Sequence, residues 1–445
     1  MPGVAVKMDS ALDCAIDGGL PGDPLPLSLT RSREDFGVND IAFGYSHLFT
    51  NGLPPAGPRF AGFPPFYFIG GNNDPTQIPS AKLAEAADAV IRRDGHLLAI
   101  YNLGLGPQGY PPLREFVADK LTRHRGISAT ADDVLITTGS GQGIDLVSAL
   151  LVNPGDTVLI EEFCYQGAIN RFRKLGAKVL PVRLDDDGIR VDSLAETLAN
   201  LKAQGVTPRF LYTIPTIQNP TGSILPLDRR LAILALAKDY GMPIFEDECY
   251  ADLLWGGGAP AAFYGLAPEQ VIHIGSFSKS LAPALRVGYA VADWSVLSRL
   301  IAGKSDGGTG ALDQMVIAEY FSRHFDDHIA SLSKVLEDKL DCMVEAVGRE
   351  FGSSVHMVRP PGGIFLWLKL PDSVDVTKLT QPAADAGLSF NAGPDWACNG
   401  SEAKPYLRLC FAMPSKETIR AGVATLARVC HEQTGIPVFG DNVKR

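Results

Sequence analysis

Strand-like and helix-like segments alternate along the middle of this chain, from about residue 80 to about residue 305. The strand-like runs are almost continuously apolar, and helical patterns such as "VDSLAETLANLKAQG" lie between most of them. Such runs are typical of strands that are buried on both faces. The predicted strands are residues 134–138, 157–161, 178–184, 209–214, 243–248, 271–276 and 287–292. The sequence therefore predicts an α/β fold with a mostly parallel mixed sheet sandwiched by helices.

The regions on either side of this core have a different character. Residues 1–75 are rich in proline, glycine and aromatic residues, which predicts an extended arm. After a long helical stretch at about 311–351, the strand-like runs "GGIFLWLKL", "LSFNAG" and "YLRLCFA" indicate a smaller α+β domain. We therefore expect an arm at 1–75 that joins the small domain, a large domain at 76–315 and a C-terminal small domain at 316–445.

Composition excludes several classes of protein. The formal net charge is −10 and no basic block occurs, so nucleic acid is not an expected partner. The seven cysteines are scattered without a CxxC pair, which argues against a disulfide framework or a zinc site. The N-terminal residues lack the pattern of a signal peptide, and the apolar runs are too short to cross a bilayer. We expect a soluble cytoplasmic protein that binds no metal.

The stretch "IGSFSKSLAPALRVGY" places Lys279 just after a predicted strand. In open α/β sheets, ligands bind beyond the carboxyl ends of the strands. A lysine amine can form a Schiff base with an aldehyde when a nearby cation lowers its pKa. Arg286 supplies such a cation and can bind a phosphate, with Ser276 and Ser278 as further donors. The stretch therefore predicts an anchor for a phosphorylated aldehyde.

Two further strand ends carry groups suited to the same ligand. In "VLITTGSGQGIDLV", Ser140, Gly141 and Gln142 lie where a helix begins, and the free N–H groups there suit a phosphate. A strand-to-helix turn without a ligand is the alternative. In "EEFCYQG", Tyr165 can lie on the face of a flat ring.

An amide and a carboxylate follow two more strands. Asn219 in "QNPTG" can donate to a phenolate oxygen or simply cap a turn. Asp247 in "FEDECYADL" can bond a protonated pyridine nitrogen, and Tyr250 follows three residues later. Glu246 and Glu248 alternate with Asp247, so only one register faces the site.

Arg408 lies inside the otherwise apolar run "YLRLCFA". An arginine there is costly unless it is paired, and a substrate carboxylate is a suitable bidentate partner. A buried salt bridge within the chain is the alternative.

Taken in order, these motifs resemble the fold-type I pyridoxal-phosphate (PLP) enzymes, specifically the class I/II aminotransferases. The aminoadipate, kynurenine and aromatic aminotransferases are the most similar branch. The resemblance extends over residues 68–432 and includes "GPQGYPPLRE", "QNPTG", "EDECYADL" and "SFSKSLAPALRVGY". It implies a Schiff-base role and proton transfer for Lys279, a pyridine contact for Asp247 and ring stacking for Tyr165.

The resemblance also implies how the rest of the ligand is held. Asn219 and Tyr250 would contact the phenolate oxygen. The phosphate would be held by Ser140, Gly141, Gln142, Ser276, Ser278 and Arg286. Arg408 and the backbone near Gly71 would bind the substrate α-carboxylate. The implied activity is transfer of an amino group from an α-amino acid, with a large side chain, to a 2-oxo acid by a homodimer.

The chain departs from the family pattern at several positions. The family has a tyrosine directly before the glycine-proline turn that contacts the phosphate of the neighbouring subunit, and Tyr101 is displaced from that place by three residues. Ala284 replaces a glycine, Cys410 replaces an asparagine and Cys164 precedes the stacking tyrosine. In the arm, three arginines could meet a distal carboxylate or simply lie at the surface. They are Arg31, Arg33 and Arg59.

Other interpretations remain open. The same cofactor supports elimination, decarboxylation or carbon–carbon bond formation, and the motifs near Lys279 do not separate these reactions. The fold also serves as an effector-sensing domain in transcription regulators, but no helix pair for DNA binding is recognisable here. The run "GLGPQG" at 104–109 matches a dinucleotide motif in a poor context. His324 and His328 could bind a metal, but a solvated helix face is the expected arrangement.

Overall fold

The computed structural model describes residues 44–50, 53, 56–57 and 59–437. Two units divide the chain, Met1–Ala61 and Gly62–Arg445, and all strands and α-helices of the described residues lie in the second. Arg31 and Arg33 fall outside the described residues, whereas Arg59 is exposed.

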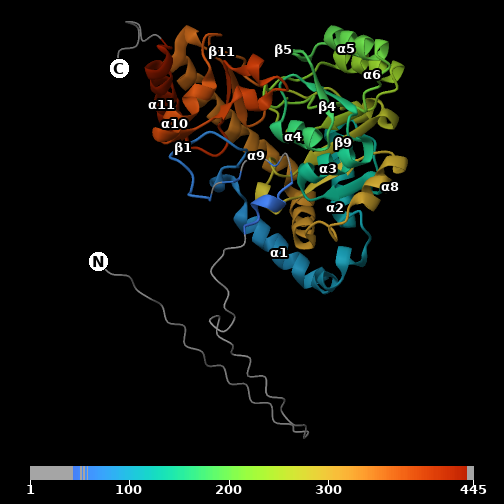
Figure 1. The fold of residues 1–445 in the computed structure, drawn as a ribbon. Coiled ribbons are helices and arrows are strands. Elements are labelled where there is room, and N and C mark those ends of the chain that lie inside the picture. The colour runs from blue at the N-terminus through green and yellow to red at the C-terminus, as the bar shows by residue number, and fades with distance from the viewer. Residues whose placement is uncertain (1–43, 51–52, 54–55, 58, 438–445) are drawn as a thin grey trace, which may run out of the picture. The chain divides into compact units, whose positions relative to one another are not determined.

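The largest sheet of the second unit has seven strands (Figure 1). Its order is β2 (Val134–Thr137), β10 (Gly288–Val291), β9 (Val271–Ser276), β8 (Ile244–Asp247), β7 (Leu211–Thr213), β3 (Thr157–Glu161) and β4 (Lys178–Val182). Only β10 runs antiparallel to its neighbours. The prediction of a mostly parallel mixed sheet is therefore confirmed.

Helices cover both faces of this sheet because its strands alternate between two apolar cores. Val134 and Ile136 of β2 face one core, whereas Leu135 faces the other. The helices of the first core are α1 (Ser80–Asp94), α2 (Pro111–Arg125), α5 (Val191–Ala203), α6 (Leu227–Asp239), α7 (Phe263–Leu266) and the start of α9 (Ala311–Phe351). Those of the second are α3 (Gly139–Leu151), α4 (Gln166–Lys174) and α8 (Trp294–Gly303).

A smaller sheet lies in the C-terminal part of the chain. Its antiparallel order is β11 (His356–Met357), β12 (Phe365–Lys369), β15 (Tyr406–Cys410) and β14 (Asn391–Ala392). The end of α9 packs with this sheet in a third core, together with α10 (Thr380–Asp385) and α11 (Lys416–Thr434). The 41 residues of α9 thus join the cores of both sheets.

Short elements connect these layers. The segment β1 (Phe66–Tyr67) pairs in parallel with β13 (Leu388–Ser389), so residues before the large sheet join the C-terminal part. The exact domain boundaries at 75/76 and 315/316 stay predictions. The remaining elements are η3 (Pro75–Gln77), η4 (Gly95–Ala99), η5 (Tyr101–Gly104), η6 (Ala131–Asp133), β5 (Leu184–Asp185), β6 (Gly188–Ile189), η7 (Pro268–Gln270), η8 (Pro283–Leu285), η9 (Gly352–Ser354), η10 (Val376–Leu379), η11 (Gly393–Trp396), η12 (Gly400–Ala403) and, in the first unit, η2 (Ser46–Leu48). No helix of the described residues is long and apolar enough to cross a membrane.

Candidate active site

Lys279 lies in the turn that follows β9, at the carboxyl edge of the large sheet. Its Nζ atom donates to the carbonyl oxygen of Gly71 at 2.7 Å. Removal of the amine from water lowers the pKa of Lys279, and the charges of Arg408 and Arg286 act in the same direction. A β-carbon at Gly71 would lie 2.4 Å from Nζ, so a larger residue there would displace the amine from this position. The amine is therefore held in place, and a larger fraction of it is neutral than for an ordinary lysine.

Two side chains from other segments hold the turn that carries Lys279, and the sequence predicted neither contact. Asn73 donates to the carbonyl oxygens of Leu281, at 3.0 Å, and of Ser278, at 3.3 Å. Nε2 of His328, on α9, lies 2.8 Å from the carbonyl oxygen of Ser280. The turn is thus held both by Asn73 and by a residue of α9.

Asp247 is the last residue of β8 and is buried at the same edge. Its Oδ2 accepts from the hydroxyl of Tyr212 at 2.7 Å, and its Oδ1 accepts from the backbone N–H of Cys249 at 3.1 Å. Burial raises the pKa of Asp247, while these donors favour its charged form. Glu246 and Glu248 have other partners, namely the N–H groups that begin α7 for the first and Arg125 for the second. Tyr212 had no signal of its own within the apolar run "RFLYTI".

Arg408 is buried, and its partners are neutral. It donates to the side-chain oxygens of Asn219, at 2.9 Å, and Asn391, at 2.8 Å, and to the carbonyl oxygen of Gly70 at 2.9 Å. Its Nε atom has no partner among the described residues, and no described carboxylate forms an ion pair with it. The alternative of an internal salt bridge is thus not found, and the guanidinium remains available to an anion.

The ring of Trp396 packs under this guanidinium, with 3.9 Å between the ring centroid and the guanidinium carbon. The Tyr165 ring lies 6.3 Å from the Trp396 ring and covers Gly167, where a β-carbon would come 2.4 Å from the tyrosine. On the opposite side, Asn219 donates to the hydroxyl of Tyr250 at 3.3 Å. These contacts bring Tyr165, Asn219 and Tyr250 to one place, as expected.

The predicted phosphate-binding residues gather around the first turn of α3. Arg286 donates to the Ser278 hydroxyl at 3.5 Å, and a β-carbon at Gly139 would lie 2.5 Å from its Nη2 atom. The side chain of Gln142 is turned away, because it accepts from Thr138 N at 2.8 Å and donates to an aspartate. Its backbone N–H, like those of Ser140 and Gly141, remains one of the free donors that begin a helix. Ser276 is buried and accepts from the N–H of Ser278 at 3.1 Å.

Tyr101 does not join these residues within the chain. It begins η5 and is 87% exposed, so its hydroxyl has no role in the site as one chain forms it. The preceding expectation, a contact with a second subunit, is not tested by a single chain.

The other candidates are resolved as follows. No helix opens on residues 104–109, since η5 ends at Gly104 and α2 begins at Pro111. The expectation of a solvated helix face is wrong for His328, which is half-buried because it packs against the Lys279 turn. Among the described residues, the one cluster with metal-ligand side chains is Glu246, Glu248 and His273. Arg230 lies 3.8–4.0 Å from both of its carboxylates, where its positive charge opposes a cation.

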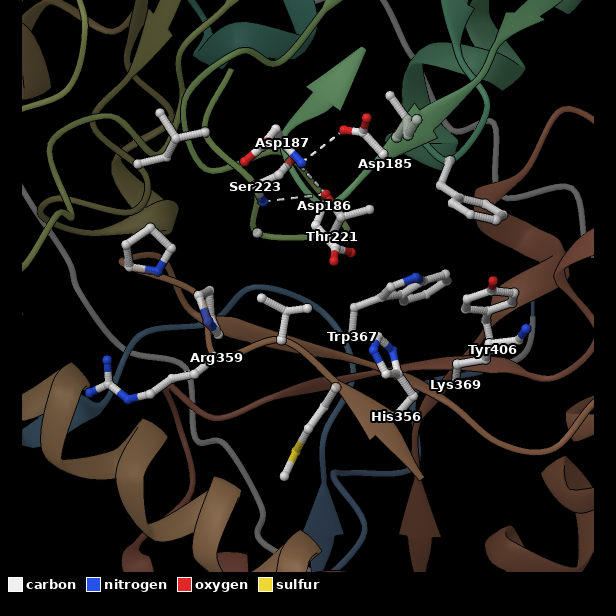
Figure 2. Close-up of a pocket in the computed structure, with 18 of the residues that line it drawn as sticks. Asp185, Asp186, Asp187, Thr221, Ser223, His356, Arg359, Trp367, Lys369 and Tyr406 are labelled. Carbon is white, nitrogen blue, oxygen red and sulfur yellow. Dashed lines mark hydrogen bonds between the residues drawn. The ribbon is translucent and has the colours of Figure 1, made fainter. Parts of the chain in front are cut away.

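A separate cleft of about 820 Å³ opens between the β5–β6 hairpin and the small sheet (Figure 2). Asp185, Asp186 and Asp187 lie on one side, and the stacked rings of Trp367 and Tyr406 lie on the other. None of the predicted site residues lines it. The candidate site is therefore the group around Lys279 rather than this larger opening.

Residues 70–426 match the family described as aminotransferase class I and II. The chain belongs to this family. The aminotransferase is 36% identical over 367 residues to the 2-aminoadipate transaminase of Thermus thermophilus, and the match covers 81% of this chain and 89% of the relative. It is 30% identical over 368 residues to aromatic-amino-acid aminotransferase 1 of Thermococcus litoralis, with 82% and 87% covered.

A solved structure gives the same result for the fold. The α-aminoadipate aminotransferase LysN of Thermus thermophilus, complexed with N-(5'-phosphopyridoxyl)-L-leucine, superposes with a TM-score of 0.77. It is 34% identical, and the match covers 83% of this chain and 93% of that one. The predicted family, branch and fold are confirmed, and this aminotransferase is PLP-dependent. The relatives favour transamination over the other reactions and over a regulatory role.

The residues present fit this cofactor on the chain's own geometry. The site offers the Lys279 amine, whose pKa is lowered, and the buried carboxylate of Asp247. The first turn of α3 adds free N–H groups, and Gly139 in that turn leaves room for the guanidinium of Arg286. The site also has a buried guanidinium without an acidic partner. These groups match an aldehyde, a ring nitrogen, a phosphate and a substrate carboxylate respectively.

Proposed function

We propose that this aminotransferase moves the amino group of an α-amino acid with a large side chain to a 2-oxo acid, with Lys279 as covalent anchor and proton carrier. One observation carries the proposal. Two consecutive carbonyl groups, those of Gly70 and Gly71, accept hydrogen bonds from Arg408 and Lys279 respectively. A carboxylate bound by Arg408 therefore lies close to the amine of Lys279, as a reaction at the adjacent α-carbon requires.

Bound PLP supplies an aldehyde for covalent attachment and a ring that takes up electrons from the substrate α-carbon. Asp247 would hold a proton on the ring nitrogen, and Asn219 with Tyr250 would bond the ring oxygen. The first turn of α3, with Ser276, Ser278 and Arg286, would hold the phosphate.

Lys279 would also serve as the base that moves the substrate proton. The carbonyl groups that fix Arg408 and Lys279 belong to neighbouring residues, so this amine would lie close to the α-carbon of a substrate held by Arg408. Its lowered pKa increases the fraction of neutral amine, which can accept a proton from the α-carbon and return it. Tyr165 and Trp396 close the aromatic side of the site and would limit the access of water.

The preference for a large side chain is supported by the aromatic lining near Arg408. Trp396 and Phe365 pack on the guanidinium, and the Tyr165 ring lies 6.3 Å from the Trp396 ring. The names of the relatives refer to aminoadipate and aromatic amino acids, which both have extended side chains.

We further propose a cytoplasmic homodimer. The segment around η4 and η5 carries exposed apolar side chains, which support an interface with a second copy. These are Leu98, Ile100, Tyr101 and Leu105. In such a dimer Tyr101 could reach the phosphate of the other subunit. The described cysteines are all free, which suits a reducing compartment.

The test is the near-visible absorbance of the purified protein, before and after single amino acids are added from a panel. We expect the wild-type protein to be yellow and the Lys279→Ala variant to be colourless. When an amino acid bleaches the wild-type protein, a 2-oxo acid should be released. Recovery of the colour with a second 2-oxo acid completes the cycle and names the donor. Release of ammonia or carbon dioxide would instead indicate another PLP reaction, and failure to take up PLP would overturn the proposal.

A further inference from the structure

The hydroxyl of Tyr212 is an unassigned buried group in direct contact with the candidate site. Tyr212 lies on β7 and Asp247 ends the neighbouring strand β8, and the two side chains share a hydrogen bond of 2.7 Å. Both residues are buried. We infer that Tyr212 is a positioning residue, which keeps Asp247 ionised and aimed at the ring nitrogen of PLP. The inference rests on the proposed function, in which Asp247 meets that nitrogen.

The position of the hydroxyl is fixed by packing. The Tyr212 ring meets Phe172 and Phe245 edge-on, with ring centroids 5.5 Å and 5.3 Å apart and interplanar angles of 73° and 76°. It has no exposed surface. Its ring therefore has no space for a different direction, and the hydroxyl is aimed by the core rather than by the ligand.

The contact answers a physical problem that the site creates. Burial raises the pKa of Asp247, so an unassisted carboxyl group there would tend to become neutral. A neutral carboxyl group cannot stabilise a positive charge on the ring nitrogen. The Tyr212 hydroxyl and the Cys249 N–H each donate to one carboxylate oxygen, which favours the charged form.

The direction of donation is fixed as well. Burial, followed by the charge of Asp247, raises the pKa of Tyr212 well above its ordinary value. The phenol therefore remains protonated and acts as a donor. The titratable groups that face this pair are Cys249 after β8, His273 on β9, Cys164 after β3 and, beyond Cys249, Lys279.

The test is Tyr212→Phe, which removes one oxygen and keeps the ring. The matched control is Tyr289→Phe, since Tyr289 is another buried tyrosine of the same sheet whose ring packs on His273. Both full-length variants are saturated with PLP, and the near-visible absorbance of the bound cofactor is titrated with pH.

Without the Tyr212 hydroxyl, the ring nitrogen carries less positive charge. The nitrogen that joins Lys279 to the cofactor then keeps its proton to a higher pH, because a nearby like charge no longer opposes it. We expect the absorbance midpoint of Tyr212→Phe to rise by about one pH unit, and its kcat to fall about tenfold with little change in KM. Tyr289→Phe should keep the wild-type midpoint.

A second measurement covers a Phe variant that does not fold. Tyr212→3-fluorotyrosine, made by site-specific incorporation, keeps the packing and donates more strongly, so the midpoint should move to lower pH. A wild-type midpoint in either Tyr212 variant that folds would overturn the inference while leaving the aminotransferase function intact. A wild-type protein that takes up no PLP would contradict the proposed function itself.

Discussion

Arg408 and Asn219 are joined by a hydrogen bond of 2.9 Å, although they are 189 residues apart in the sequence. Asn219 uses its other amide atom to donate to Tyr250. The group proposed to bind the substrate carboxylate is thus tied to the pair proposed to bind the cofactor oxygen. A substitution that alters binding of the substrate carboxylate should therefore also alter the contact with the cofactor oxygen, and the reverse.

Asn219→Ala tests this connection. Loss of the amide removes an acceptor from Arg408 and a donor from the cofactor oxygen, so both substrate affinity and the cofactor spectrum should change. We expect kcat/KM to fall about 100-fold, since two buried hydrogen bonds are lost together. Steady-state kinetics and the near-visible spectrum check this. A variant that changes KM alone, with an unaltered spectrum, would contradict the connection.

Arg408→Lys separates charge from geometry. A lysine keeps the positive charge but cannot bind a carboxylate through two parallel N–H groups. We expect KM for the amino acid to rise at least about 50-fold, because a bidentate charged contact is reduced to a single one. PLP content and absorbance should be those of the wild type. An unchanged KM would show that the substrate carboxylate binds elsewhere.

Gly71→Ala should disturb Lys279 without unfolding the protein. The added methyl group would stand 2.4 Å from Nζ, so the amine must move. We expect attachment of PLP, measured by mass spectrometry after borohydride reduction, to fall by about 90%, an energetic loss comparable to a lost hydrogen bond. Gly348→Ala on α9 is the control, since a β-carbon there meets nothing within 4 Å. Equal attachment in the two variants would contradict the close contact.

The pH dependence of covalent attachment follows from the lowered pKa of Lys279. Only the neutral amine attacks an aldehyde, so the rate should rise with pH and level off below the ordinary lysine value of about 10.4. Arg286→Gln removes a cation, so the pKa rises and the midpoint should move to higher pH. The probe is pyridoxal without its phosphate, which separates this effect from phosphate binding. A midpoint that is the same in both proteins would exclude a role for the Arg286 charge.

Glu248 gives a prediction about stability. Burial opposes its charge, but Arg125 outweighs this effect and lowers the pKa of Glu248 to about 2. Because the folded pKa lies below the unfolded value, the stabilisation is complete above about pH 4.3 and is lost as the pH falls toward 2. Glu248→Gln leaves Arg125 without its carboxylate and should cost about 3 kcal/mol at pH 7. Thermal unfolding from pH 7 to pH 3 should show the deficit shrinking on acidification.

The sequence predicted those site residues whose positions depend on the alternation within a strand or on the place where a strand ends. The register of Asp247 between two glutamates follows from the two-residue repeat of a strand, and Lys279 lies three residues beyond the end of β9. The strand predicted at 209–214 is shorter, Leu211–Thr213, because the chain beyond it turns toward Asn219.

Contacts between distant segments could not be predicted in this way. Asn73 reaches Leu281 over 208 positions, and Tyr212 meets Asp247 only because β7 and β8 are neighbours. Asn391 meets Arg408 because β14 pairs with β15, and Trp396 reaches the same guanidinium from the short helix η11. The orientation of Gln142 likewise depends on Asp306, which lies 164 residues away.

The continuous helix α9 has a consequence for how the molecule comes apart. With 41 residues it extends about 60 Å, and it places Met315 in the core of the large sheet and Phe351 in that of the small one. If either core unfolds and α9 unfolds with it, the other core loses the helix residues that pack against it. Heat or denaturant should therefore unfold the two halves in a single cooperative transition, and limited proteolysis should find no stable fragment between them.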